Sequence, residues 1–130
     1  MKYSTFEAKL RFGIKRILVD NVESKIIDSS DHKNNRKVII TGYDDNHNKF
    51  LISQAWLIDK HGNINIHGLW LYPEQYNKNV MISPQSAVAR LLSHYNCSKP
   101  RDLKDNIVFA YPNDRKFLAI IAYDWNSKLS

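Results

Sequence analysis

The chain has 130 residues, of which 43% are hydrophobic and 25% charged, a composition that excludes wholesale disorder. This length predicts a single domain over residues 1–130 with a hydrophobic core of its own. The net charge of +6 favours anionic partners, among them nucleic acid and acidic proteins. Cys97 is the only cysteine, so no disulfide can form within the chain and a cytoplasmic location is expected. Residues 1–19 lack the apolar run of a signal peptide or membrane span, and no membrane partner is expected.

The first predicted element is a long strand that begins near residue 6. Apolar residues alternate with polar ones from Phe6 to Ile14, and only a strand places such residues on one face. We expect a bend near Gly13 and a basic outer face formed by Lys9, Arg11 and Lys15. Residues 17–19 and 22–27 either continue this strand or form a short second one.

Residues 37–72 predict a three-stranded antiparallel meander. A β-branched run at 37–41 predicts its first strand, and residues 50–58 the second, joined by the turn-forming residues 44–48. Residues 61–63 form the next turn. Trp56 is expected in the core, on one strand face with Phe50, Ile52 and Ile58.

The third strand of this meander changes its pattern at Gly68. Residues 63–67 alternate between polar and apolar, whereas residues 69–72 are all apolar or aromatic. A β-bulge at Gly68 would bring the two halves into register. The core face then holds Ile64, Ile66, Leu69 and Leu71. The opposite face holds Asn65, His67, Trp70 and Tyr72, and it suggests a surface on which bases stack; whether Trp70 is there or in the core stays open.

A helix is predicted over about residues 83–96, with Ser83 as its N-cap and Pro84 in its first turn. Its apolar positions recur at helical spacing: Val88, Leu91, Leu92 and Tyr95. Strands at 106–111 and 116–123 follow, joined by a tight turn at 112–115.

The fold class is therefore a β-rich α+β fold, with one helix before a C-terminal hairpin. Two architectures remain open, an antiparallel sheet covered by the helix and a small OB-like barrel. The order of elements resembles the OB-fold, whose helix lies between its third and fourth strands and which often binds single strands. An extra strand before the helix departs from that five-stranded plan.

Nucleic acid is bound by cations that displace counterions and by rings that stack on bases. The candidate nucleic-acid-binding residues are Lys9, Arg11, Lys15, Arg36, Lys37, His67, Trp70 and Tyr72. Arg16, Lys33, Tyr43 and Trp56 are further candidates. The alternative interpretation is that the lysines are merely solvated and the tryptophans belong to the core.

Metal binding and catalysis have weaker support in the sequence. The five histidines show no metal-ligand spacing, and Cys97 follows a helix C-terminus, so no metal or cofactor is expected. Asp44, Asp45 and His47 have side chains suited to acid–base chemistry, but their setting indicates a hairpin turn. Without a phosphate loop, nucleophile elbow or dinucleotide fingerprint, an enzyme is not expected.

The sequence thus favours a small basic accessory protein that binds nucleic acid, preferentially a single strand, since one helix offers no helix-turn-helix pair. By analogy it would assist a replication enzyme of a phage, plasmid or mobile element. The alternative is an adaptor or inhibitor that docks a polymerase, helicase or nuclease through the aromatic sheet face. Nucleic acid is favoured if the cations Lys9, Arg11 and Lys15 flank the aromatic face of Trp70 and Tyr72, and a protein partner if neutral Asn and Ser residues surround it.

Overall fold

A computed structural model describes residues 13–26, 36–71 and 86–123 of the chain. Its strands are β1 (Lys15–Ile26), β2 (Arg36–Tyr43), β3 (Lys49–Ile52), β4 (Gln54–Ile58), β5 (Ile64–Gly68), β6 (Trp70–Leu71), β7 (Ile107–Pro112) and β8 (Leu118–Tyr123). Between β6 and β7 lie the α-helix α3 (Ala87–His94) and the 3₁₀-helix η1 (Pro100–Leu103). The predicted β-rich α+β fold class is confirmed.

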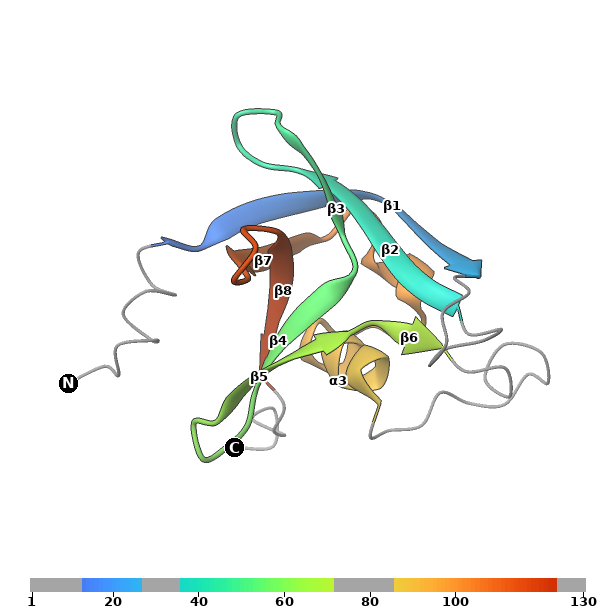
Figure 1. The fold of residues 1–130 in the computed structure, drawn as a ribbon. Coiled ribbons are helices and arrows are strands. Elements are labelled where there is room, and N and C mark those ends of the chain that lie inside the picture. The colour runs from blue at the N-terminus through green and yellow to red at the C-terminus, as the bar shows by residue number, and fades with distance from the viewer. Residues whose placement is uncertain (1–12, 27–35, 72–85, 124–130) are drawn as a thin grey trace.

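The strands form one curled sheet in the order β3-β2-β1-β7-β8-β4-β5, and β6 pairs back onto β2. β3 and β4 are consecutive pieces of one bent strand, interrupted at Ser53, so the chain itself connects the β3 edge to β4 (Figure 1). With β3–β4 counted as one strand and β5–β6 as an extra one, the strands β1, β2, β3–β4, β7 and β8 follow a five-stranded order in which α3 falls between the third and fourth. This arrangement is OB-like. One pair departs from the antiparallel expectation, because β4 runs parallel to β8.

The N-terminal strand, β1, begins later than predicted and runs without interruption to Ile26. Gly13 is helical and β1 begins at Lys15, while predicted positions 6–12 lie outside the described residues. A Cβ on Gly13 would meet the ring of Tyr111 at 2.8 Å, so this position packs closely rather than forming a strand bend. From Lys15 to Ile26 the chain is one strand with a register shift between Val19 and Asn21, which settles the open choice for residues 17–26; residue 27 lies outside the described residues.

The main core fills the inside of the curled sheet and is covered by α3, which lies beside β4, β6 and β8 (Figure 1). The predicted Val88, Leu91 and Leu92 are the buried residues of the helix. The helix starts later than predicted, because Ser86 is its N-cap and accepts a 3.1 Å hydrogen bond from the backbone N–H of Ala89. Ser83 and Pro84 lie outside the described residues.

The expected meander is divided at Ser53. β3 pairs with β2, whereas β4 pairs with β5 and β8, so the two halves of the predicted second strand join different parts of the sheet. The break also changes which side chains point inward. Phe50 and Ile52 pack in the main core, but Trp56 and Ile58 belong to a smaller cluster on the outer face. The expectation that Trp56 lies in one core with Phe50 and Ile52 was wrong.

The predicted bulge at Gly68 is absent, and alternation runs unbroken through residues 64–71. Residues paired across a sheet point to the same side. Ile66 pairs with Trp56 and is 37% exposed on the outer face, and Ile64 packs in the outer cluster. Both were predicted in the core; the outer cluster explains why they are apolar. Leu69 and Leu71 are buried in the main core, as predicted.

Candidate functional site

Two hairpin turns of the described chain share one hydrogen-bonding pattern. Asp44 Oδ1 accepts bonds of 2.9 Å from the backbone N–H groups of both Asn46 and Asn48, and Asn48 Nδ2 donates to its Oδ2. In the same way, Asp59 Oδ1 accepts hydrogen bonds from the backbone N–H groups of His61 and Asn63, and Asn63 Nδ2 donates to Asp59 Oδ2. In each turn the third residue after the aspartate has a left-handed backbone, at φ 64° in His47 and 83° in Gly62.

These hydrogen bonds lower the pKa of both aspartates and engage their carboxylates within the turns. The backbone N–H of Asn48, followed by its side chain, holds the pKa of Asp44 below its ordinary value, and Asn63 does the same for Asp59. Asp44 also lies 3.6 Å from Lys15 Nζ. Its carboxylate is therefore engaged by its own turn and one cation, in agreement with the turn predicted at residues 44–48.

The β7–β8 hairpin repeats this pattern with an asparagine in place of the aspartate. Asn113 Oδ1 accepts hydrogen bonds of 2.9 and 3.0 Å from the backbone N–H groups of Arg115 and Phe117. Lys116 takes the left-handed conformation, at φ 67°. The remaining group of the side chain, Nδ2, donates a 2.7 Å bond to Oε1 of Gln54 on β4. This bond ties the hairpin to the strand break.

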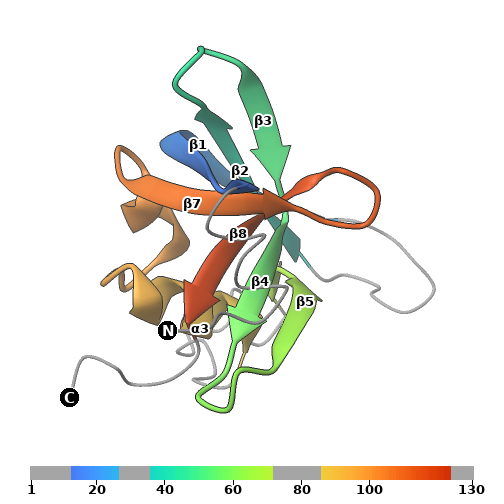
Figure 2. The same cartoon turned by 90° about the vertical axis from the view of Figure 1, so that its left-hand side faces the viewer.

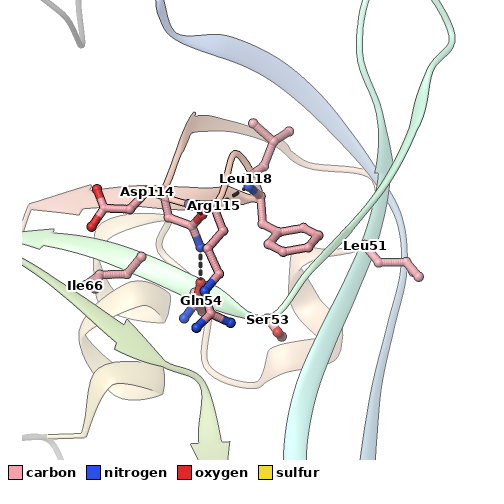
Figure 3. A pocket seen from close by; sticks show the side chains of 9 residues that line it. Leu51, Ser53, Gln54, Ile66, Asp114, Arg115 and Leu118 are labelled. Atoms are coloured by element: carbon pink, nitrogen blue, oxygen red, sulfur yellow. Dashed lines mark hydrogen bonds between the residues drawn. The ribbon is translucent and has the colours of Figure 1, made fainter.

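A pocket of about 480 Å³ lies between this hairpin and the break at Ser53 (Figure 3). It is lined by Leu51, Ser53, Gln54, Ile66, Asn113, Asp114, Arg115, Phe117 and Leu118, and is called the strand-break pocket below. Figure 2 shows the β7–β8 hairpin reaching past the junction of β3 and β4. Leu51 and Phe117 are 64% and 65% exposed, so the pocket presents an apolar side chain and a ring to solvent.

A cation and a tryptophan adjoin the strand-break pocket. Gly68 pairs with Gln54, and a Cβ on Gly68 would lie 2.6 Å from both Trp70 Nε1 and Lys37 Nζ. Lys37 Nζ is 4.3 Å from the centroid of the Trp70 ring, a cation–π contact between cross-strand partners. Burial lowers the pKa of Lys37. Lys37 and Trp70 together with the pocket make up the strand-break surface.

The structure does not gather all the predicted binding residues on this surface. Lys37 and Trp70 lie on it, whereas Lys15 is near the other end of β2, against Asp44 and 5.7 Å from the Phe50 ring centroid. Arg36 pairs with Leu71, and His67 pairs with Ala55; both partners are buried. Arg36 and His67 therefore occupy strand positions on the inner face of the sheet, whereas Trp70 is on the outer face. Lys9, Arg11, Lys33 and Tyr72 lie outside the described residues.

The other residues of the strand-break surface were missed by sequence reasoning. The sequence predicts a turn at residues 112–115 and an ordinary strand position for Gln54, with no binding role for either. One usable signal was present: Phe117 follows Arg115 and Lys116 at a hairpin tip, where a large ring has no core to enter.

A second exposed patch covers the outer face of β1, β2 and β7. Leu18, Ile107 and Phe109 are 50%, 39% and 45% exposed, and cross-strand pairing places Arg16 beside Phe109 and Leu18 beside Ile107 and Tyr43. A hollow of about 270 Å³ adjoins it, lined partly by Asp44, Asp45 and His47. Arg16 thus takes the outward position on β1 that was predicted for Lys15.

Within residues 13–26, 36–71 and 86–123, no three His, Cys, Asp or Glu side chains form a possible metal site. The helices of the same ranges are all too short or too polar to cross a bilayer. The chain matches no protein-family model, no curated protein and no solved structure.

Proposed function

We propose that the protein is a non-catalytic nucleic-acid-binding accessory protein that holds a single strand on the strand-break surface. The observation that carries the proposal is the exposed ring of Phe117 at a pocket that also contains Arg115. OB-folds bind oligonucleotides on the face of their second and third strands and through the loop between their last two. The strand-break pocket occupies the corresponding place, between β3–β4 and the β7–β8 turn.

The preference for a single strand follows from how the surface would make contact. Phe117 offers a ring face for stacking, and the bases of a duplex already have their faces covered by neighbouring bases. The pocket volume of about 480 Å³ is within the ordinary range for sites that hold a small organic group, which suits one nucleobase. Arg115 and Lys116 at the hairpin tip supply positive charge for the phosphates.

In this proposal the protein assists replication of a phage, plasmid or mobile element in the cytoplasm, beside a replication enzyme. The excess of cations over the whole chain supports a nucleic-acid partner, and the lone cysteine is in keeping with a reducing compartment.

Fluorescence anisotropy of a labelled oligo(dT) of about 30 nucleotides tests the proposal. We expect binding that weakens as salt is raised and that exceeds binding to a duplex of equal length. Phe117→Ala should weaken it about fivefold or more, since stacking on one base contributes about 1–3 kcal/mol. Phe109→Ala is the matched control, because Phe109 is also exposed but does not line the pocket. Equal effects of the two variants, or no binding at low salt, would contradict the proposal.

A second candidate function is protein docking through the outer face of β1 and β7. It is favoured by the contiguous exposure of Leu18, Ile107 and Phe109, because apolar side chains grouped in this way mark interaction surfaces. The partner would be a polymerase, helicase or nuclease. This alternative predicts no oligo(dT) binding at low salt, together with a complex with a purified replication enzyme that Leu18→Lys abolishes and Phe117→Ala leaves intact.

A further inference from the structure

The orientation of the Asn113 side chain is fixed by the backbone around it. Two N–H groups, those of Arg115 and Phe117, donate to the same side-chain atom, which must therefore be the oxygen. The other end of the amide is then the nitrogen, and it is this nitrogen that donates to Gln54. If the amide of Asn113 were turned around, its NH₂ group would face the backbone N–H groups of Arg115 and Phe117, and three donors would meet without an acceptor.

The fixed Asn113 in turn fixes Gln54. Since Gln54 Oε1 accepts from Asn113 Nδ2, the group that Gln54 has left is its amide nitrogen with two N–H donors. Gln54 lines the strand-break pocket, and nothing in the described part of the chain accepts a hydrogen bond from that nitrogen. The pocket therefore contains a polar donor of known identity that is open to an incoming group.

The two aspartate turns show that the hairpin itself does not require asparagine. Asp44 and Asp59 accept the same pair of backbone hydrogen bonds with one oxygen, and an asparagine of their own turn donates to the other. In the β7–β8 turn Phe117 replaces that asparagine, and the second atom of residue 113 is a donor aimed at Gln54. The β7–β8 turn thus differs from the two aspartate turns in the hydrogen bond from Asn113 Nδ2 to Gln54, and this bond orients the Gln54 side chain.

We propose that Gln54 reads position 4 of a pyrimidine held in the strand-break pocket and selects a carbonyl oxygen there, favouring uracil or thymine over cytosine. This inference rests on the proposed single-strand binding. Uracil and cytosine are pyrimidines of nearly equal size, but uracil has a carbonyl oxygen at position 4 where cytosine has an amino group. An N–H donor of Gln54 makes a hydrogen bond with the first and meets another donor in the second. Asn113 acts as a positioning residue.

The test compares labelled oligo(dU) and oligo(dC) of about 10 nucleotides by anisotropy at one salt concentration, and its readout is the ratio of their dissociation constants. The wild-type protein should prefer oligo(dU) by about three- to tenfold, the discrimination expected of one hydrogen bond. Gln54→Leu, which keeps the size but removes the donor, should bring the ratio close to one.

Asn113→Asp provides the sharper variant, because it should fold like the two aspartate turns. A carboxylate accepts but does not donate, so the Gln54 amide should turn its nitrogen toward residue 113 and its oxygen toward the pocket. The preference should then pass to oligo(dC), whose amino group donates to that oxygen. Asn46→Asp is the charge control, because it adds the same negative charge in an exposed turn outside the pocket: it changes the affinity for both oligonucleotides and leaves their ratio as in the wild type.

The outcomes separate the two proposals. If the wild type binds both oligonucleotides equally and Phe117→Ala weakens both, base selection by Gln54 is wrong and single-strand binding stands. If the wild type prefers oligo(dU) but Asn113→Asp leaves that preference unchanged, the orienting role of Asn113 is overturned. If neither oligonucleotide binds, both proposals fall.

Discussion

The hydroxyl of Tyr95 donates a 2.7 Å hydrogen bond to the carbonyl oxygen of Ile121 and accepts one of 3.1 Å from the backbone N–H of Phe109. Tyr95 is the C-cap of α3, so one hydroxyl connects the end of the helix to both strands of the C-terminal hairpin. The hydroxyl thus supplies the hydrogen-bond partner of one backbone group on each strand, and removing a partner from such groups costs free energy.

We predict that Tyr95→Phe lowers the free energy of unfolding by about 1–3 kcal/mol, through the two backbone groups that it leaves unpaired. Urea denaturation followed by far-UV circular dichroism measures this change. Tyr43→Phe is the matched control, since the described part of the chain makes no hydrogen bond to the Tyr43 hydroxyl, and its effect should stay within about 0.5 kcal/mol. A loss of similar size in both variants would contradict the role of the Tyr95 hydroxyl.

The Tyr95 hydroxyl also makes the free energy of unfolding fall at alkaline pH. Burial raises the pKa of Tyr95 from 10.0 to about 12. Between these values the unfolded chain releases the proton and the folded protein retains it, so stability falls as the pH rises. The protonated Tyr95 hydroxyl stabilises the fold fully below pH 10. Once the pH exceeds the folded pKa, the free energy of unfolding has fallen by about 2–3 kcal/mol. Urea titrations from neutral to alkaline pH should show this extra loss in the wild type and not in Tyr95→Phe; parallel curves would contradict it.

Gly42 lies where β2 crosses the irregular part of β1. A Cβ at this position would overlap Cγ2 of Ile17 and lie 2.8 Å from the backbone oxygen of Leu18. Because a backbone atom cannot move aside like a side-chain tip, Gly42→Ala should cost about 1–3 kcal/mol of unfolding free energy. Thermal denaturation measures the loss, and a melting temperature equal to that of the wild type would contradict the close approach of β1 and β2.

Gly68 leaves room for Trp70 and Lys37 on the strand-break surface. Gly68→Ala places a methyl group where Trp70 Nε1 and Lys37 Nζ now lie 2.6 Å away, so both groups must shift. We expect a modest loss of stability, about 1–2 kcal/mol, and a several-fold weaker affinity for oligo(dT). Anisotropy under conditions where the variant is fully folded separates the two effects. An unchanged affinity would remove Trp70 and Lys37 from the binding surface.

Local signals in the sequence identified most elements. The helical spacing of Val88, Leu91 and Leu92 located α3, and the turn residues around Asp44 and Asn113 located two hairpins, because these features depend on neighbours along the chain. The strand exchange at Ser53 depends on contacts far apart in sequence. It needs the parallel pairing of β4 with β8, for which a single chain offers no local pattern.

The candidate site was harder to predict for the same reason. Gln54 and Asn113 are 59 positions apart and meet only because the sheet curls. The outer cluster around Trp56 also misled the assignment of faces, since alternation identifies an apolar face without saying which of two clusters covers it. Lys37 and Trp70 are both binding candidates in the sequence, but their contact with each other follows from a pairing between β2 and β6 that the sequence does not predict.

The most direct test of single-strand binding is a titration of ¹⁵N-labelled protein with oligo(dT), followed in the ¹H–¹⁵N correlation spectrum. The strand-break surface predicts the largest shifts at the backbone of Leu51 and Phe117, the side-chain amide of Gln54 and the indole N–H of Trp70. Resonances of Leu18, Ile107 and Phe109 should move little. Shifts concentrated on those three residues, or a spectrum unchanged at saturating oligonucleotide, would contradict the proposed site.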